Sequence, residues 1–340
     1  MFDQQLPLLD LSCDDEESHW GEFVIAGRPW RTSPVFNTYW HFATERQNIF
    51  FRRLNGDNSI TDDPILRTFK FTNVYRASDR VSQYLIKNVI YQGLQTPEEL
   101  CFRILLFKLF NKIETWELLQ RRLGELTWKH TSLKEVSFVL NEAFHQGLRI
   151  YSAAYIMPSG GKLHPRKHDA HLNLLNAMMS DRVPDRISEM SSMREAFCLL
   201  RSYPMLGDFL AYQFVTDLNY STLCDFTEAE FVVAGPGARD GIRKCFPDLP
   251  LDMADEAIRA IFLGQELEFN SRNLEFRKLW GRALQLIDCQ NVFCEVDKYS
   301  RVAHPQITGL SCRSRIKQVF KSSGDLPAPY YPPKWKLQPA

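Results

Sequence analysis

Asp225 is the residue of this sequence whose type and position best suit catalysis. It follows Gly207 by 18 residues and directly precedes residues 226–228 (FTE), where a new helix is expected. A fixed carboxylate at the start of a helix can stabilise positive charge that develops on a sugar, or position an attacking water. The alternative is an ordinary N-cap, a frequent role of Asp.

Residues 202–213, upstream of Asp225, predict two helices joined by a tight turn. Pro204 and Gly207 lie in the turn, and the small side chain of Ala211 permits a close helix crossing. In a helix-hairpin-helix, backbone N–H groups of such a turn face a DNA phosphate. A plain corner between two helices would use the same residues, so the turn by itself leaves both interpretations open.

A glycine-rich segment follows the expected carboxylate. Gly235, Gly237 and Arg239 could form a nest of backbone N–H groups that binds a phosphate, or a loop that needs unusual φ values. No Gly-Lys-Ser/Thr follows, and residues 159–163 (SGGKL) fail the same test. The phosphate-binding loop of nucleotide kinases is therefore not indicated.

A polar stripe at helical spacing is predicted over residues 72–90. Its members could hydrogen-bond an unusual base substituent, since Arg suits bidentate recognition, or could form a solvated helix face. Tyr155 is a candidate for stacking on a base, and Lys298 for contacting a phosphate or a base substituent. The predicted substrate-binding residues are Asn73, Arg76, Asp79, Arg80, Tyr155 and Lys298.

Metal and cofactor sites are not expected. The histidines at 164, 168 and 171 have helical spacing, but Lys162, Arg166 and Lys167 interleave with them, and metal sites avoid crowded cations. A basic patch that contacts DNA phosphate is the preferred interpretation. The eight cysteines contain no C-x-x-C pair, which argues against thiolate metal ligands.

The elements that must position these residues are almost all helical. Residues 96–110 open with a Thr-Pro-Glu-Glu N-terminal signal, and residues 132–135 form a capping box whose helix should stop at Gly147. A short strand pair is expected around residues 23–25. Further helices are expected at 168–179, 187–202, 208–217, 228–233, 254–267 and 273–288.

The predicted organisation is a mostly α chain with an N-terminal extension (1–35), a helical domain (36–321) and a Pro-rich C-terminal tail (322–340). Forty-one basic and 41 acidic residues give a net charge of zero, which excludes a histone-like polycation but permits a local basic face for nucleic acid. Neither a signal peptide nor a run of 18 apolar residues is found. We expect a cytoplasmic monomer without membrane contact.

Four segments resemble one family, the DNA base hypermodification proteins, over roughly residues 36–305. They are 61–66 (TDDPIL), 71–80 (FTNVYRASDR), 102–116 (FRILLFKLFNKIETW) and 290–299 (QNVFCEVDKY). This family comprises the helical domain of phage hydroxymethyluracil DNA kinases and the alpha-glutamyl/putrescinyl-thymine pyrophosphorylases. It also includes stand-alone anti-phage DNA glycosylases with a helix-hairpin-helix glycosylase-like fold. The resemblance implies a two-lobed helical enzyme that acts on modified bases in double-stranded phage DNA.

The resemblance to helix-hairpin-helix glycosylases further implies roles for single residues. Asp225 would be the catalytic carboxylate, and Asn111 and Lys112 would fill the gap left by a flipped base. Met205 replaces the first hairpin glycine, and Phe209 stands where bifunctional relatives carry a Lys nucleophile, so no β-lyase step is expected.

Two enzymatic functions and one non-enzymatic function remain open. The first is a monofunctional DNA glycosylase that excises a hydroxymethylated or glucosylated pyrimidine and leaves an abasic site, in anti-phage defence. The alternative is an amino acid:DNA transferase, in which an amine displaces pyrophosphate from an activated hydroxymethylpyrimidine. A DNA-binding module without activity is the third.

Overall fold

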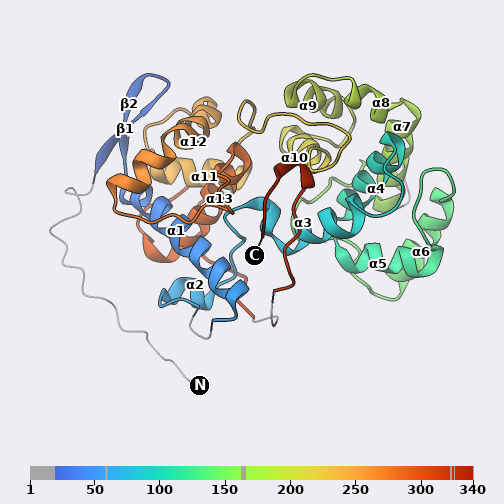
Figure 1. Ribbon diagram of the computed structural model, residues 1–340, viewed down its shortest axis with the longest axis horizontal. Helices are drawn as coiled ribbons and strands as arrows, with labels where there is room; N and C mark the ends of the chain where they lie inside the picture. Colours follow the sequence, from blue (N-terminus) through green and yellow to red (C-terminus); the bar gives the residue numbers. More distant parts are fainter. Residues whose placement is uncertain (1–19, 58–59, 162–165, 322–323, 325, 340) are drawn as a thin grey trace.

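The fold is mostly α-helical, as predicted. The computed structural model describes residues 20–57, 60–161, 166–321, 324 and 326–339. The helices lie in two groups, joined by a narrow middle region (Figure 1). The first group contains β1 (Gly21–Ile25), β2 (Arg28–Thr32), α1 (Pro34–Asn55), α2 (Pro64–Thr68), α11 (Pro236–Cys245), α12 (Ala254–Ser271) and α13 (Leu286–Ala303).

The second group is continuous in sequence. It contains α4 (Pro97–Phe110), α5 (Ile113–Leu123), α6 (Leu133–His145), α7 (Lys167–Ser180), α8 (Val183–Ser188), α9 (Met193–Arg201) and α10 (Asp208–Leu218). The chain enters it through a 3-10 turn (Arg76–Ser78), α3 (Arg80–Tyr84) and a π-helical turn (Leu85–Ile90), and returns through an irregular segment at 219–235. The first group is therefore built from both ends of the chain.

Local sequence signals fix several of these helices. Pro97 starts α4, and Asn111 ends it in the left-handed conformation. The Ser132 side chain caps α6 by accepting a hydrogen bond from the Glu135 backbone N–H, and Gly147 follows the helix with φ +74°. The predicted strand pair is confirmed as the hairpin β1–β2, whose turn residues Ala26 and Gly27 both have positive φ.

Four helix predictions are wrong. Residues 71–75 precede the 3-10 turn in irregular backbone, so no single helix spans 72–90. No helix forms at 228–233, and residues 273–285 are largely irregular before α13 begins at Leu286. The predicted helix at 187–202 is two shorter helices, α8 and α9.

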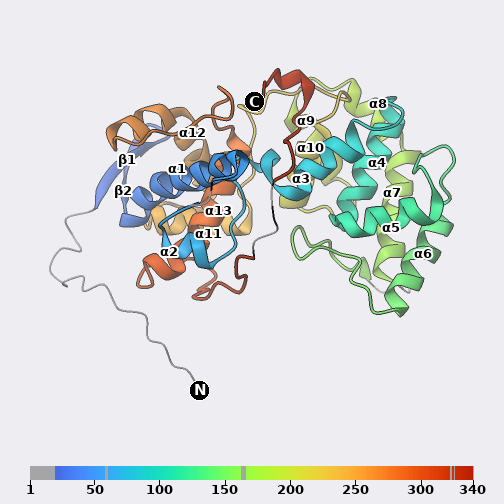
Figure 2. The ribbon, with the colours of Figure 1, turned by 60° about the horizontal axis from the view of Figure 1, so that its bottom comes forward.

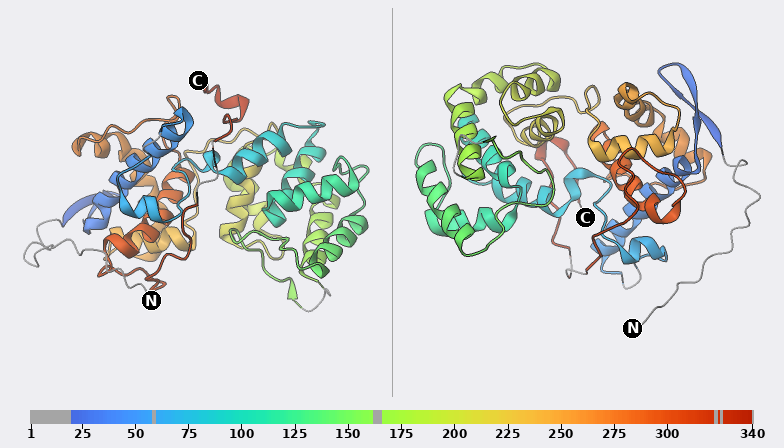
Figure 3. Two further views of the ribbon diagram at one scale, coloured as in Figure 1. Left: turned by 90° about the horizontal axis from the view of Figure 1, so that it is seen from below. Right: turned by 180° about the vertical axis from the view of Figure 1, so that it is seen from behind.

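The middle region is held together from three parts of the chain. α10 packs against α4 and α9, while α13 packs against α1, α11 and α12 and contacts the 3-10 turn. Residues 326–339 also lie at this junction, with Tyr331 bonded to Ser78 and the Trp335 ring against Tyr220 (Figures 2 and 3). Buried hydrophobic residues form one continuous cluster through both groups.

Tight helix contact in the first group depends on a glycine. A Cβ atom added at Gly241 in α11 would lie 2.1 Å from the Phe293 carbonyl oxygen in α13. Within the described residues, no helix is both long and apolar enough to cross a membrane.

Candidate functional site

A buried cluster of three charged residues lies where the two helix groups meet. Asp217, near the end of α10, forms ion pairs with Arg76 Nη1 and Lys108 Nζ, both at 2.7 Å. Arg76 comes from the 3-10 turn and Lys108 from α4, and all three side chains are at most 3% exposed. Two cations share one carboxylate, so the cluster carries one net positive charge when all three residues are ionised.

Hydrogen bonds and aromatic rings surround the Arg76 guanidinium. Its Nε donates to Gln213 Oε1 at 2.9 Å, and its Nη1 donates to the Tyr220 hydroxyl at 3.0 Å. Tyr155 covers the cluster from a different segment, with Lys108 Nζ 3.9 Å from its ring centroid. Tyr155 is partly exposed and also stacks on Phe209. Of the residues that surround the cluster, Tyr155 is therefore the one closest to solvent.

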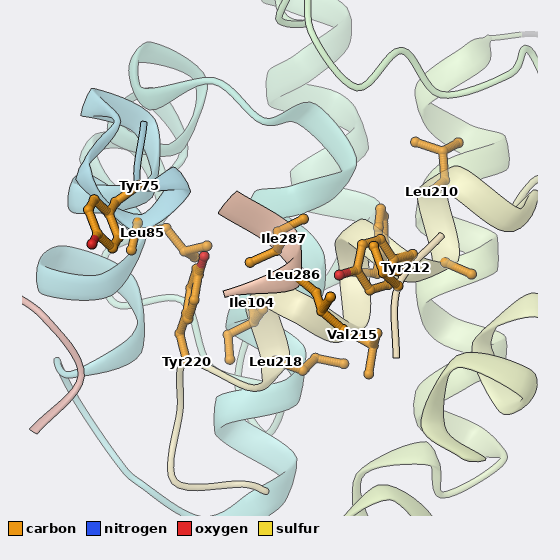
Figure 4. Packing of buried hydrophobic residues seen from close by; sticks show 14 of the residues in the cluster. Tyr75, Leu85, Ile104, Leu210, Tyr212, Val215, Leu218, Tyr220, Leu286 and Ile287 are labelled. Carbon is orange, nitrogen blue, oxygen red and sulfur yellow. The ribbon is translucent and has the colours of Figure 1, made fainter. Parts of the chain in front are cut away.

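The polar cluster is embedded in apolar side chains. Figure 4 shows Ile104 of α4, Val215 and Leu218 of α10, and Leu286 of α13 close to Tyr220 and Tyr212. All of these side chains are buried. Burial of charges in such surroundings is costly unless they are paired, which explains why each cation contacts the same carboxylate.

Burial and mutual attraction shift the pKa values in the cluster. Burial raises the pKa of Asp217, but Arg76 and Lys108 lower it further than burial raises it, so the carboxylate stays ionised. Burial lowers the pKa of Lys108, and Asp217 compensates only partly because Arg76 repels the ammonium. Asp217 outweighs burial for Arg76, whose pKa is raised. Lys108 is thus the group in the cluster that most readily loses its proton.

Three carboxylates hold the backbone that leads into Arg76. The backbone N–H of Thr72 donates to Glu295 at 2.9 Å, that of Asn73 to Asp79 at 2.7 Å, and that of Arg76 to Asp288 at 2.9 Å. Two of these acids have shifted pKa values, because burial raises the pKa of Asp79 to about 7 and that of Asp288 to about 6. These side-chain acceptors take the place of helical backbone hydrogen bonds in this segment.

The four segments that carry the family resemblance meet around this region. The first and fourth are joined by a hydrogen bond of 2.6 Å between the Tyr299 hydroxyl and Asp63. The second and fourth are joined by the Glu295 bond described above and by Asn291, which donates to the Asn73 carbonyl. The third contributes Lys108, whose partner Asp217 also binds Arg76 of the second.

The predicted substrate-binding stripe is only partly realised. Arg76 and Tyr155 lie together in the cluster, and Asn73 and Asp79 bond to each other next to it. Arg80 is exposed and approaches Glu114 at 3.7 Å, so it does not share a face with Arg76, as the helix prediction required. Lys298 is paired with Glu295 at 2.7 Å.

Asp225 does not occupy the predicted position. It lies in the irregular segment after α10 rather than at the start of a helix, because the helix expected at 228–233 does not form. Its side chain is 84% exposed and pairs with Lys334 at 3.2 Å. Neither the N-cap nor the fixed, enclosed carboxylate predicted for Asp225 is present.

The two residues predicted to fill the place of a flipped base differ in their exposure to solvent. Asn111 is the left-handed C-cap of α4 and is buried. Lys112 is partly exposed and pairs with Glu114 at 3.2 Å. Of the two, only Lys112 can extend toward a ligand without rearrangement of the backbone.

The turn between α9 and α10 retains the predicted layout. Met205, at the replaced glycine position, has φ +68°, a conformation that costs a non-glycine residue energy. Gly207 is the N-cap of α10, and Pro204 and Gly207 line a shallow concave surface. Asp208 in the first turn of α10 is paired with Arg201, and its negative charge disfavours a phosphate at this helix end.

The glycine-rich segment is not an anion nest. Gly235 is the N-cap of α11 with φ −71°, and neither it nor Gly237 has positive φ. A Cβ atom added at Gly235 would lie 2.5 Å from the Phe209 ring, and one added at Gly237 would lie 2.4 Å from Cys294 Sγ. The glycines permit close packing, while Arg239 donates to the Ala234 and Leu251 carbonyls.

Only part of the predicted histidine patch lies within the described residues. Within the described residues, no group of three or more His, Cys, Asp or Glu side chains could hold a metal ion. His171 lies between the Tyr151 hydroxyl and the Pro158 carbonyl, both at 2.8 Å. His164 and Lys162 fall outside the described residues.

Sequence reasoning missed Lys108, Asp217 and Gln213. Lys108 is the lysine that interrupts the long apolar run of α4, and Gln213 and Asp217 are spaced i, i+4 in the mostly apolar α10. A polar residue within an apolar helix needs a buried partner. That signal was available in the sequence, although it could not tell which helices would meet.

Comparisons with known proteins agree with this convergence of family segments. Residues 33–309 match the family described as "5-hmdU DNA kinase, helical domain", and this chain belongs to that family. The 5-hmdU DNA kinase of Bacillus phage SP10 is 26% identical over 290 residues, which cover 78% of this chain and 45% of that protein. The chain thus spans about half the length of this curated relative. No solved structure matches the chain.

These comparisons overturn the glycosylase prediction. The matched family and relative are described as a DNA kinase, which is a transferase, and not as a hydrolase of the glycosidic bond. The prediction of a monofunctional DNA N-glycosylase with Asp225 as its catalytic carboxylate is therefore wrong. The predicted membership in the DNA hypermodification family is confirmed.

Proposed function

We propose that this chain is a DNA-modifying transferase that acts on an activated hydroxymethylpyrimidine in double-stranded DNA, including phage DNA. An amine nitrogen would form a bond to the methylene carbon of the base and lose a proton to solvent. The carbon–oxygen bond to pyrophosphate would break, and pyrophosphate would leave with the bonding electrons. The observation that carries the proposal is the buried Arg76–Lys108–Asp217 cluster with its net positive charge. The family membership supplies the substrate class.

The members of the cluster suit different parts of this reaction. Arg76 and Lys108 offer cationic donors for the phosphate oxygens of the leaving group, and a dry site strengthens such contacts. Asp217 orients both cations from one position on α10. Tyr155 presents a partly exposed ring beside them for stacking on the pyrimidine.

Entry of the substrate requires displacement of Tyr155. Arg76 and Lys108 are almost fully buried, and the Tyr155 ring lies over both. An extruded base that replaced this ring would contact the same two cations. The energy needed to extrude a base from the duplex is a few kcal/mol.

The predicted helix-hairpin-helix arrangement is used here only as a geometry for DNA binding, and not as an indication of glycosylase activity. The partly exposed Lys112 would lie near the duplex. The turn with Pro204 and Gly207 would face the DNA without a phosphate contact at the helix end, where Asp208 disfavours one. In this arrangement both helix groups would contact the DNA, and the modified base would bind at the junction between them.

The decisive experiment is mass spectrometry of nucleosides after reaction. DNAs with thymine, 5-hydroxymethyluracil or its phosphorylated and pyrophosphorylated forms are incubated with the protein and a mixture of amino acids and polyamines. We expect a heavier, amine-bearing nucleoside from an activated DNA only. Unchanged masses with every DNA would refute transfer.

Lys108→Met tests the cluster within the same assay. The substitution removes a buried cation and keeps most of the side-chain volume, so transfer should fall at least 100-fold while the melting temperature stays measurable. Lys134→Met, an exposed lysine on α6, is the matched control and should retain full activity. Equal activity of the two variants would remove Lys108 from the site.

A further inference from the structure

A second pocket lies in the first helix group, away from the charge cluster. It has a volume of about 420 Å³ and lies between α1, the segment at 60–67 and residues 69–71 with Phe320. It shares no lining residue with the Arg76–Lys108–Asp217 cluster. Its volume is within the range of small-molecule sites in proteins.

Arg46 is the unusual residue of this pocket. Its side chain lines the pocket and the residue is only 9% exposed, yet it forms no hydrogen bond or ion pair with any described residue. Its Nη1 atom is fully buried without a partner. An unpaired buried guanidinium is costly to the free protein, and a ligand that paired with it would remove this cost.

The neighbouring acids are occupied by other partners. Glu295 pairs with Lys298 at 2.7 Å and also accepts from the Thr72 backbone N–H, while Asp79 accepts from the Asn73 backbone N–H. Both acids attract Arg46 electrostatically, but neither lies within ion-pair distance. The guanidinium is therefore available to a ligand that enters the pocket.

The charge of the pocket indicates the charge of its ligand. Arg46, Arg53 and Arg67 line it together with one acid, Asp62, which leaves two net positive charges. A phosphate monoester carries nearly two negative charges at neutral pH and accepts several hydrogen bonds from guanidinium groups. A single carboxylate would neutralise only half of this charge.

The remaining walls favour a planar or apolar body next to the anion. Phe69, Phe71 and Phe320 line the pocket together with Ile49 and Leu66. Phe320 is held there because its backbone N–H donates to the Thr68 carbonyl at 2.9 Å. Aromatic faces next to arginines are suited to a nucleobase and its phosphate.

We propose that this pocket binds a phosphate group attached to a nucleobase-sized body, such as a mononucleotide. The phosphate contacts Arg46 in the interior and Arg67 at the rim, while the phenylalanine rings contact the base. The site does not depend on the transfer reaction proposed above, because it shares no residue with that cluster. The phosphate belongs either to a free nucleotide or to a DNA strand, and these two sources can be separated by experiment.

Binding to the full chain is measured by calorimetry with four probes: thymidine 5′-monophosphate, thymidine, inorganic phosphate and a short DNA duplex. We expect the nucleotide to bind at least tenfold more tightly than thymidine or phosphate. Arg46→Gln and Arg67→Gln should each weaken it at least tenfold. Arg121→Gln, which removes an exposed arginine on α5, should leave the affinity unchanged.

A stability readout distinguishes a ligand-binding Arg46 from a structural one. Because the unpaired charge is costly, Arg46→Gln should raise the melting temperature of the free protein and abolish the rise that the nucleotide causes. A lower melting temperature with an unchanged nucleotide affinity would overturn the proposal. If Arg46→Gln fails to fold, the exposed Arg67→Gln decides the matter by itself.

The duplex separates the two sources of phosphate. Loss of duplex affinity in both pocket variants, with no binding of the mononucleotide, would assign the site to a DNA phosphate and overturn the free-nucleotide source. If no probe depends on Arg46 or Arg67, the pocket is not a phosphate site.

Discussion

Asp217 is the single residue on which the buried cluster depends, because it is the shared partner of two buried cations. Asp217→Asn keeps the shape of the side chain and removes its charge. Arg76 and Lys108 then remain buried without a counter-charge, a situation that costs about 3–5 kcal/mol in proteins. We expect a loss of this size in the free energy of unfolding, measured with urea, together with loss of transfer activity.

Two comparisons make the Asp217 prediction specific. Asp208→Asn, on the same helix but 66% exposed, should change stability by no more than about 0.5 kcal/mol. Adding Lys108→Met to Asp217→Asn should recover part of the lost stability, because one uncompensated cation is removed. An Asp217→Asn variant as stable as the wild type would mean that the ion pairs contribute little.

Residue type alone could nominate candidates for the site, and their roles as substrate contacts stay predictions. Arg76 and Tyr155 were chosen as an arginine and an aromatic ring suited to a modified base, and they lie together in the cluster. Lys108 and Asp217 were missed because periodicity shows which face of a helix is apolar but not which helices meet. Asp225 was misplaced because its position depended on a helix that does not form.

At the scale of elements, the close contact between α11 and α13 depends on Gly241. Gly241→Ala would place Cβ 2.1 Å from the Phe293 backbone oxygen, and backbone cannot move aside as a flexible side chain can. The helices must separate, and we expect a loss of about 2–4 kcal/mol in the free energy of unfolding, on the scale of severe overpacking.

Gly264→Ala in α12 is the matched control for this helix contact. Its Cβ would lie 3.6 Å from the Phe23 ring, an ordinary contact. Because alanine favours a helix interior by about 1 kcal/mol over glycine, this variant should equal or exceed the wild type in stability. Equal effects at both positions would show that helix propensity, and not the α11–α13 contact, governs them.

Elements with complete local signals were predicted, and those shaped by distant contacts were not. Thr96-Pro97 and Ser132 mark the starts of α4 and α6 within a few residues of sequence. The segment at 72–76 has helical spacing but is irregular, because carboxylates of α13, more than 200 positions away, take hydrogen bonds from its backbone N–H groups. No local pattern encodes such partners.

At the scale of the whole molecule, the junction between the helix groups concentrates buried acids whose protonation is linked to folding. Burial raises the pKa of Asp79 to about 7 and that of Asp288 to about 6, and both side chains accept backbone hydrogen bonds that hold the connecting segment. In an unfolded chain these carboxyl groups titrate near pH 4. The two groups therefore link the stability of the junction to pH.

The sign of this linkage follows from proton counts. Between about pH 4 and 7 the folded protein holds a proton on Asp79 that the unfolded chain has lost, so the contribution of this group to stability falls as the pH rises. Arg46, Arg76 and Glu295 are the charged groups that act on Asp79, and they remain in an Asp79→Asn variant. Compared with wild type, that variant should therefore gain on the order of 1–2 kcal/mol in unfolding free energy between pH 4.5 and 7.5, measured by urea titration.

The exposed Asp252→Asn serves as the control for loss of one carboxylate, and its difference from wild type should not change with pH in this way. If the Asp79→Asn difference stays flat with pH, the carboxyl group is ionised in the folded protein, and the junction is held by a charged acid instead of a neutral one.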